Sequence, residues 1–143
     1  MTENNQYLVF KLDKEAYGIN IKEIYEVLRL KEILITEIPN VPKYVEGIIN
    51  LRGNVIPLIN LRAKLKLEKN IINKKNRVII VNLKGKKVGI LVDKILKIFN
   101  FHNCKMFSSC REIKCKYNYI KGLYKKQNYQ IFILNINNLF DIK

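Results

Sequence analysis

The sequence has few of the residues on which disulfide-stabilised proteins and many enzymes depend. It contains one histidine, three cysteines and no tryptophan in 143 residues. The thiols of Cys104, Cys110 and Cys115 are odd in number and include no C-x-x-C pair, so no disulfide framework is expected. His102 stands beside no carboxylate motif that would orient it as a general base. These absences argue against a secreted scaffold and against histidine-based catalysis.

Long apolar runs and an apolar leader are also missing. The longest apolar stretches, such as residues 78–81, have the length of a strand, whereas a membrane-spanning helix needs about 20 residues. Residues 1–6 are polar and lack the apolar core of a signal peptide. The sequence therefore predicts a cytosolic protein that does not insert into a membrane.

Acidic residues are scarce, and the formal net charge is +15. One interpretation is an acidic partner, such as a nucleic acid, an anionic membrane or an acidic protein. The other is compositional drift, because Lys, Asn and Ile, all with AT-rich codons, supply 63 of the 143 residues. Only five of the 27 basic residues are arginine, the residue that favours bidentate phosphate binding. We favour drift.

Motifs that carry chemistry are equally rare. The sequence contains neither G-x-x-x-x-G-K-[ST] nor G-x-G-x-x-G, so no phosphate loop is predicted. His102 and the three cysteines are spaced H-x-C-x5-C-x4-C, which lacks the paired knuckle typical of zinc sites. Asp93 follows an apolar run and is interpreted as a turn former at a strand end. We expect no metal, no cofactor and no enzymatic activity.

The dominant pattern is a series of short apolar runs separated by turns, which predicts an all-β barrel or sandwich in one domain. Residues 22–30 fit a helix or a strand equally well, and residues 43–47 are predicted to form one helical turn. Pro57 is predicted to lie at an edge or a bulge because it cannot donate a ladder hydrogen bond. The predicted strands are 7–12, 17–21, 33–35, 48–53, 54–61, 77–83, 87–92, 95–101, 119–124 and 130–134, with loops over 68–76 and 103–118 and short helices over 63–67 and 135–143.

One segment is far more specific than the rest. Residues 42–62 read PKYVEGIINLRGNVIPLINLR. This resembles the signature of the CheW family of chemotaxis coupling proteins, P-x-x-[IV]-x-G-[IV]-x-N-L-R-G-x-[IV]-x-P-[IVL]-[IV]-D-L-R. Other segments agree in order: an opening hairpin at 7–10 and 17–19, a V-G-x-x-V-D strand at 88–93, and a closing pair at 119–122 and 131–134. The resemblance extends over about the whole chain.

The resemblance implies one CheW-like domain, residues 1–143, made of two small SH3-like five-stranded barrels with a hydrophobic groove between them. Short helical turns and a short C-terminal helix complete this expected fold. It also implies a non-catalytic adaptor that binds the cytoplasmic tips of chemoreceptors and the regulatory domain of the histidine kinase CheA. Its place would be the cytoplasm, next to membrane-bound receptor arrays through these partners.

The receptor-binding residues expected from the family are both apolar and polar. Arg52 is expected to form a charge-assisted hydrogen bond to the receptor or to Glu26, and Gly89 to allow close backbone approach. For the isoleucines, plain core packing is an equally good interpretation. The kinase-binding residues are unknown. The expected set is Ile24, Glu26, Asn50, Arg52, Gly89, Ile95 and Ile98.

One alternative and two departures from the family stay open. The alternative is a basic β-barrel that binds nucleic acid, with bases stacked on aromatic residues among the lysines. These aromatic residues are Phe99, Phe101, Phe107, Tyr117, Tyr119 and Tyr124. Asn60 replaces the Asp that is usual in the family, which puts an anionic role at that position in doubt. The strong positive charge is also unusual for a family with acidic members.

Overall fold

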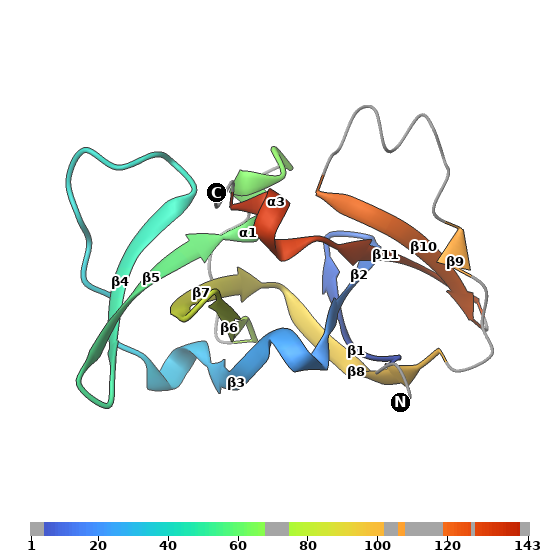
Figure 1. The fold of residues 1–143 in the computed structure, drawn as a ribbon. Helices are drawn as coiled ribbons and strands as arrows, with labels where there is room; N and C mark the ends of the chain where they lie inside the picture. The colour runs from blue at the N-terminus through green and yellow to red at the C-terminus, as the bar shows by residue number, and fades with distance from the viewer. Residues whose placement is uncertain (1–4, 68–74, 102–105, 108–118, 127, 141–143) are drawn as a thin grey trace. The chain divides into compact units, whose positions relative to one another are not determined.

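The computed structural model describes residues 5–67, 75–101, 106–107, 119–126 and 128–140 (Figure 1). The chain divides into two compact units. We call residues 23–94 the middle unit, and residues 1–22 with 95–143 the terminal unit, since the latter contains both chain ends. Each unit has its own sheet, and the described helices are single turns. The predicted all-β fold with short helices is confirmed.

The middle unit contains a five-stranded sheet in the order β3-β6-β7-β5-β4. All neighbouring strands are antiparallel except β5 and β7, which run parallel where residues 58–60 pair with residues 89–91. Its elements are β3 (Ile24–Arg29), η2 (Leu30–Glu32), β4 (Val45–Leu51), β5 (Asn54–Asn60), α1 (Leu61–Lys64), β6 (Arg77–Leu83) and β7 (Lys86–Val92). A 3-10 turn, η1 (Ile21–Glu23), precedes β3.

The edge of this sheet at β4 is partly covered by the segment that follows η2. Thr36 and Ile48 exchange two backbone hydrogen bonds, with N to O distances of 2.9 and 2.8 Å. Gly47 lies beside this bridge with φ +150°, and a Cβ there would approach the Thr36 carbonyl oxygen to 2.3 Å. A glycine is therefore required for the segment to cross β4 so closely.

Alternating apolar residues build the core of the middle unit. Val78 and Ile80 of β6 pack with Ile56 and Leu58 of β5, and all four are at most 1% exposed. The intervening residue of β6, Ile79, is also fully buried. Both faces of β6 are therefore removed from water, which explains its continuous apolar run.

The terminal unit contains a six-stranded sheet in the order β8-β1-β2-β11-β10-β9. Here β2 and β11 form the parallel pair, and α3 follows β11 just as α1 follows β5. The two sheets thus share one plan, in which two hairpins join through a parallel pair of strands. The elements are β1 (Gln6–Leu12), β2 (Glu15–Asn20), β8 (Lys94–Asn100), β9 (Met106–Phe107), β10 (Ile120–Lys126), β11 (Tyr129–Leu134) and α3 (Ile136–Leu139).

Aromatic side chains fill much of the core of the terminal unit. Phe101 stacks on Tyr124 with ring centroids 4.1 Å apart, and Phe99 stacks on Phe101. Phe99, Phe101 and Tyr124 are 2%, 1% and 6% exposed. These rings are occupied by packing against one another, so they present no free faces for stacking bases.

Several predicted boundaries differ from the structure. Residues 33–35 form no strand, because only Thr36 bridges to β4 and Ile33 and Ile35 pack on the core from an irregular segment. The predicted helical turn over 43–47 is wrong, since β4 begins at Val45. Residues 24–29 form a strand. The predicted loops lie outside the described residues over 68–74, 103–105 and 108–118, as does the end of the C-terminal helix at 141–143.

Pro57 lies inside the sheet, in β5 between β4 and β7, and not on an edge strand. It pairs with Ile48, and the parallel ladder to β7 begins only at the next residue, Leu58. In the described part of the chain, β7 does not pair with β5 at residue 57. The missing N–H of Pro57 therefore costs the sheet no hydrogen bond there. Of the two predicted places, an edge or a bulge, the edge is wrong, whereas an irregularity of the β4–β5 pairing falls just beyond the adjacent pair of Gly47 and Leu58.

Candidate functional site

The most distinctive surface feature of the middle unit is an ion pair between Glu26 and Arg52. Nη1 and Nη2 of Arg52 donate to the two carboxylate oxygens of Glu26 at 2.8 and 2.9 Å. The Arg52 side chain is 63% exposed and that of Glu26 is 23% exposed. Glu26 lies on β3 and Arg52 at the tip of the β4–β5 hairpin, at opposite ends of the strand order. The pair therefore links the two outer parts of a curved sheet through a planar fork.

A tight turn holds Arg52 in place. Leu51 pairs with Asn54, so Arg52 and Gly53 form a two-residue loop, with φ values of 50° and 86°. Positive φ at both positions is the mark of a type I′ turn, which suits Gly and Asn and disfavours arginine. Asn50 stabilises the turn, since its Oδ1 accepts from the Gly53 N–H at 3.0 Å. Arg52 thus has an unfavourable backbone conformation in this turn, and from there its side chain reaches Glu26.

The electrostatics of the pair favour its charged form. The hydrogen bonds from Arg52 lower the pKa of Glu26 below its ordinary value, against the opposing effect of partial desolvation. The charges of Arg52 and Lys87 lower that pKa further. In turn, the hydrogen bonds to Glu26 raise the pKa of Arg52. Both groups are therefore ionised at neutral pH, and a binding partner meets an exposed guanidinium beside a carboxylate.

The other expected residues of the middle unit have different surroundings. Ile24 is half-buried on β3, and Asn50 is exposed but engaged in its turn. Gly89 is buried, and a Cβ there would meet Val78 and Leu58 at 3.2 and 3.3 Å. Gly89 thus lets β7 pack closely on the core, which is a structural requirement whatever its part in binding.

The remaining two expected residues, Ile95 and Ile98, belong to β8 of the terminal unit. Ile95 is half-buried, whereas Ile98 is 54% exposed. Ile98 is one of seven exposed large apolar side chains in the described residues, so it offers apolar area to a partner. The interpretation of Ile98 as core packing is therefore wrong, because half of its surface faces solvent.

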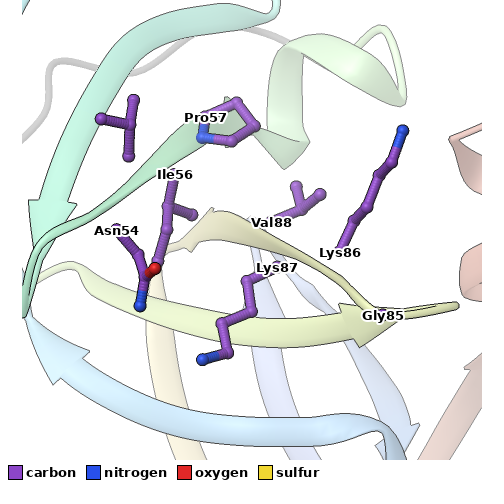
Figure 2. A pocket seen from close by; sticks show the side chains of 8 residues that line it. Asn54, Ile56, Pro57, Gly85, Lys86, Lys87 and Val88 are labelled. Carbon is purple, nitrogen blue, oxygen red and sulfur yellow. The ribbon is translucent and has the colours of Figure 1, made fainter.

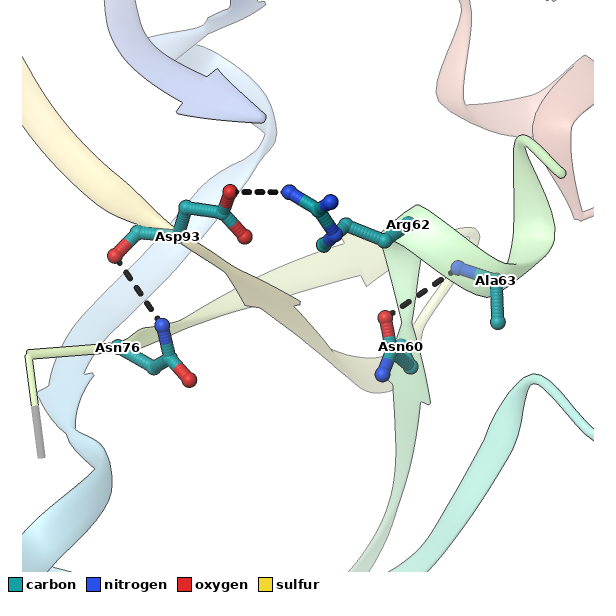
Figure 3. Close-up of polar contacts among 5 residues, drawn as sticks. All are labelled: Asn60, Arg62, Ala63, Asn76 and Asp93. Atoms are coloured by element: carbon teal, nitrogen blue, oxygen red, sulfur yellow. Dashed lines mark hydrogen bonds and ion pairs between the residues drawn. The ribbon is translucent and has the colours of Figure 1, made fainter. Parts of the chain in front are cut away.

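A second polar cluster, built around the buried Arg62, includes the end of the signature segment in the middle unit (Figure 3). Arg62 of α1 donates from Nη1 to Asp93 Oδ2 at 2.5 Å, and its side chain is only 5% exposed. The backbone carbonyl of Asp93 accepts from Asn76 Nδ2 at 3.3 Å. Asp93 was expected to act as a turn former, and it also serves as the acidic partner of a buried arginine.

Asn60 has two hydrogen-bonding roles in this cluster. Its Oδ1 accepts from the Ala63 N–H at 3.3 Å and so caps α1. Its Nδ2 donates to Oε1 of Glu46 at 2.8 Å. An aspartate could fulfil only the first role, because it has no donor to offer Glu46 when ionised. Asn60, which departs from the family pattern, therefore makes a hydrogen bond to Glu46 that the usual aspartate could not make.

One contact near the ion pair was not anticipated. Nζ of Lys87 lies 3.8 Å from the centre of the ring of Tyr25, a residue that is 49% exposed. The alternation of β3 exposes Tyr25 and Val27, but the partner of Tyr25 lies on β7, far along the chain. The alternating pattern of β3 predicts that Tyr25 is exposed, but it cannot predict the contact between Tyr25 and Lys87.

The described residues contain no group of three or more His, Cys, Asp and Glu side chains able to hold a metal ion. His102, Cys104, Cys110 and Cys115 lie outside that part of the chain. Within it, no helix has the length and apolar character needed to span a bilayer. The site is thus defined by exposed pairs and apolar side chains on strands.

The fold and these surface features define the chain as a small two-sheet β protein whose conspicuous groups lie on exposed strands and a hairpin tip. The model of the CheW-like domain matches residues 6–143. The chain therefore belongs to the CheW-like family.

Individual relatives agree with this assignment. The chemotaxis protein CheW of Treponema pallidum is 30% identical over 99% of this chain and 85% of that protein. The CheW of Helicobacter pylori is 30% identical over 94% of this chain and 80% of that protein. The crystal structure of the scaffolding protein TtCheW from Thermoanaerobacter tengcongensis matches with a TM-score of 0.84 and 31% identity. That match covers 99% of this chain and 95% of the other. This chain therefore shares the fold of that protein.

Proposed function

We propose that this protein is a chemotaxis adaptor that couples the cytoplasmic tips of chemoreceptors to the regulatory domain of the histidine kinase CheA. The observation that supports it most strongly is the family match over residues 6–143. The signature segment within that match places an exposed, ionised Arg52–Glu26 pair on the surface. Such a fork suits recognition of a polar side chain on a partner.

The proposed receptor-binding residues include this pair in the middle unit and, separately, apolar side chains of the terminal unit. Arg52 offers donors to the receptor, while Ile98 offers exposed apolar area. Gly89 contributes through the packing of β7 and Asn50 through the turn that presents Arg52. The proposed set is Ile24, Glu26, Asn50, Arg52, Gly89, Ile95 and Ile98. The kinase-binding residues are not assigned.

The test is a pull-down in which the protein must retain both a receptor-tip fragment and the kinase. Arg52→Ala is expected to weaken receptor retention while kinase retention and the circular dichroism spectrum stay unchanged. Lys84→Ala is a matched control, because Lys84 occupies the same position of a two-residue turn with the same φ of 50°. Equal retention of the receptor by the Arg52→Ala variant and the wild type would remove Arg52 from the site.

The remaining parts of this proposal concern what the protein does not do and where it acts. We propose a non-catalytic, cofactor-free scaffold in the cytoplasm, attached to receptor arrays through its partners. We also propose that residues 1–143 act as one domain made of two barrel subdomains. A stoichiometric zinc content in protein purified without chelator would contradict the cofactor-free state.

The relatives described above give no support to nucleic-acid binding. The net charge of +15 nevertheless makes a direct test worthwhile. Electrostatic binding to a polyanion falls steeply with salt, so labelled DNA or RNA should show no salt-sensitive shift at low ionic strength. A steep salt dependence would revive this function.

A further inference from the structure

A pocket lies between β5 and β7 of the middle unit, away from the Arg62–Asp93 cluster. Its volume is about 380 Å³, and residues 54–57 and 85–88 line it. Figure 2 shows the side chains that the two strands contribute. The volume is at the lower end of the range of about 300–1,000 Å³ that is usual for ligand sites. The pocket is therefore large enough for a few side chains of a partner.

The pocket exists because two hairpins diverge. The parallel ladder of β5 and β7 begins at Leu58 and Gly89, so the preceding residues of both strands are paired only with their own hairpin partners in the described chain. In each hairpin the pair that closes the two-residue turn is hydrogen-bonded, and hydrogen-bonded and non-hydrogen-bonded pairs alternate from there. Val55, Pro57 and Lys87 consequently direct their backbone polar groups away from their hairpin partners, toward the gap.

These backbone groups form two short strand edges that face each other. Val55 and Lys87 each offer an N–H and a C=O, and Pro57 offers a C=O. Strand edges of this kind pair readily with an added extended segment. Because Pro57 has no N–H, a strand added along β5 can form its hydrogen bonds mainly with the backbone of Val55.

The side chains indicate the chemistry of the segment that would fit. Val55 is 63% exposed, and Pro57 is also exposed. The lining includes Lys86 and Lys87 and contains no carboxylate. Lys87 is positioned by its contact with Tyr25. Side chains alternate along each strand, so Val55, Pro57 and Lys86 lie on one face of the sheet and Lys87 on the other. Apolar side chains would thus meet Val55 and Pro57 on the first face, and carboxylates would meet Lys87 on the second.

We propose that this pocket binds an extended peptide segment of a partner protein in which apolar and acidic residues alternate. The segment adds as a short strand to the edge at Val55, with its apolar side chains against Val55 and Pro57 and its carboxylates on the face of Lys87. This proposal goes beyond the adaptor function, because it concerns strand addition to β5, in a pocket that adjoins the proposed receptor-binding set at Lys87 and Val55.

The test uses a fluorescein-labelled Val-Glu-Val-Glu-Val peptide and its uncharged counterpart Val-Gln-Val-Gln-Val. The acidic peptide is expected to shift the backbone amide resonances of residues 54–56 and 85–88, and the uncharged peptide to bind more weakly. Lys86→Glu with Lys87→Glu should weaken binding by about tenfold. Lys14→Glu with Lys121→Glu is the matched control, since both lysines are exposed and the change in net charge is the same.

Because Lys87 is half-buried and contacts Tyr25, the double variant could unfold, so two single variants at exposed residues are tested as well. Lys86→Glu and Val55→Glu change exposed side chains and should each weaken binding while the melting temperature stays unchanged. Equal weakening by the control pair would overturn the proposal, since binding would then follow net charge alone. Identical shifts from free glutamate would overturn strand addition. Concentration-dependent shifts without peptide would identify a second copy of the chain as the occupant and would also overturn the proposal.

Discussion

The signature segment contains the tripeptide Asn-Leu-Arg twice, at residues 50–52 and 60–62, with different outcomes. In both copies the Asn side-chain oxygen accepts from the backbone N–H three residues ahead, and the Arg pairs with a distant carboxylate. The first Arg side chain is 63% exposed and the second 5% exposed. Identical residues therefore yield one surface group and one buried structural group.

The residue after each tripeptide decides this difference. Gly53 follows the first copy and adopts φ 86°, which completes a tight turn and leaves Arg52 at the hairpin tip. Ala63 follows the second copy and continues α1, whose Leu61 is fully buried. The helix carries Arg62 inward with Leu61. The local backbone, more than the tripeptide itself, determines whether the arginine is available to a partner.

The largest expected effect is on the buried copy. Arg62→Ala removes the ion pair between a buried arginine and the partly buried Asp93, and we expect the free energy of unfolding to fall by about 3 kcal/mol. Urea unfolding monitored by circular dichroism measures this. Arg52→Ala in the exposed copy should leave the midpoint almost unchanged. Equal losses from the two variants would show that exposure does not separate the copies.

A second prediction concerns the asparagine of the buried copy. Asn60→Asp restores the residue usual in the family but places a carboxylate against Oε1 of Glu46, and should cost about 2 kcal/mol at neutral pH. Repulsion would raise the pKa of the coupled carboxyl groups. The variant should therefore approach wild-type stability at acidic pH, where the pair holds a proton, and lose stability as pH rises through the raised value.

Glu46→Gln provides the matched control for that variant. In the double variant the new amide at position 46 can donate to the new carboxylate at position 60, so the second change should recover most of the lost stability. Urea midpoints of the four proteins in this cycle give the coupling between residues 46 and 60. If the two changes are simply additive, the explanation of Asn60 by Glu46 is wrong.

The sequence predicted the turns and strands around the two arginines better than the contacts that these arginines make with residues far along the chain. The turn near residue 53 and the strands on both sides followed from turn chemistry and the family resemblance, which also gave Glu26 as one of two expected partners of Arg52. The pair Arg62–Asp93 spans 31 residues, and no periodicity links its members. Likewise, residues 33–35 have the composition of a strand, yet the chain crosses β4 there with a single bridge. Tertiary context decided both cases.

A smaller effect on stability, with a large effect on binding, is expected at the exposed copy. Arg52→Asn replaces a residue that is disfavoured at positive φ by one that a type I′ turn prefers before glycine. The hairpin should become slightly more stable while the fork to Glu26 is lost. Thermal unfolding and the receptor pull-down together measure this, and a less stable variant would show that the ion pair outweighs the strained backbone.

The smallest effect should appear in the titration of Glu26. Because Arg52 lowers the pKa of Glu26 in the folded protein, the pair stabilises the fold above the ordinary pKa of the carboxyl group. That contribution is lost as pH falls through the lowered value. Carbon-detected NMR should find the titration midpoint of Glu26 below 4.5, the ordinary value. Arg52→Ala should move the midpoint upward, whereas Lys84→Ala should not. A midpoint insensitive to Arg52 would mean that the fork does not persist in solution, and the two arginines would then differ in order as well as in exposure.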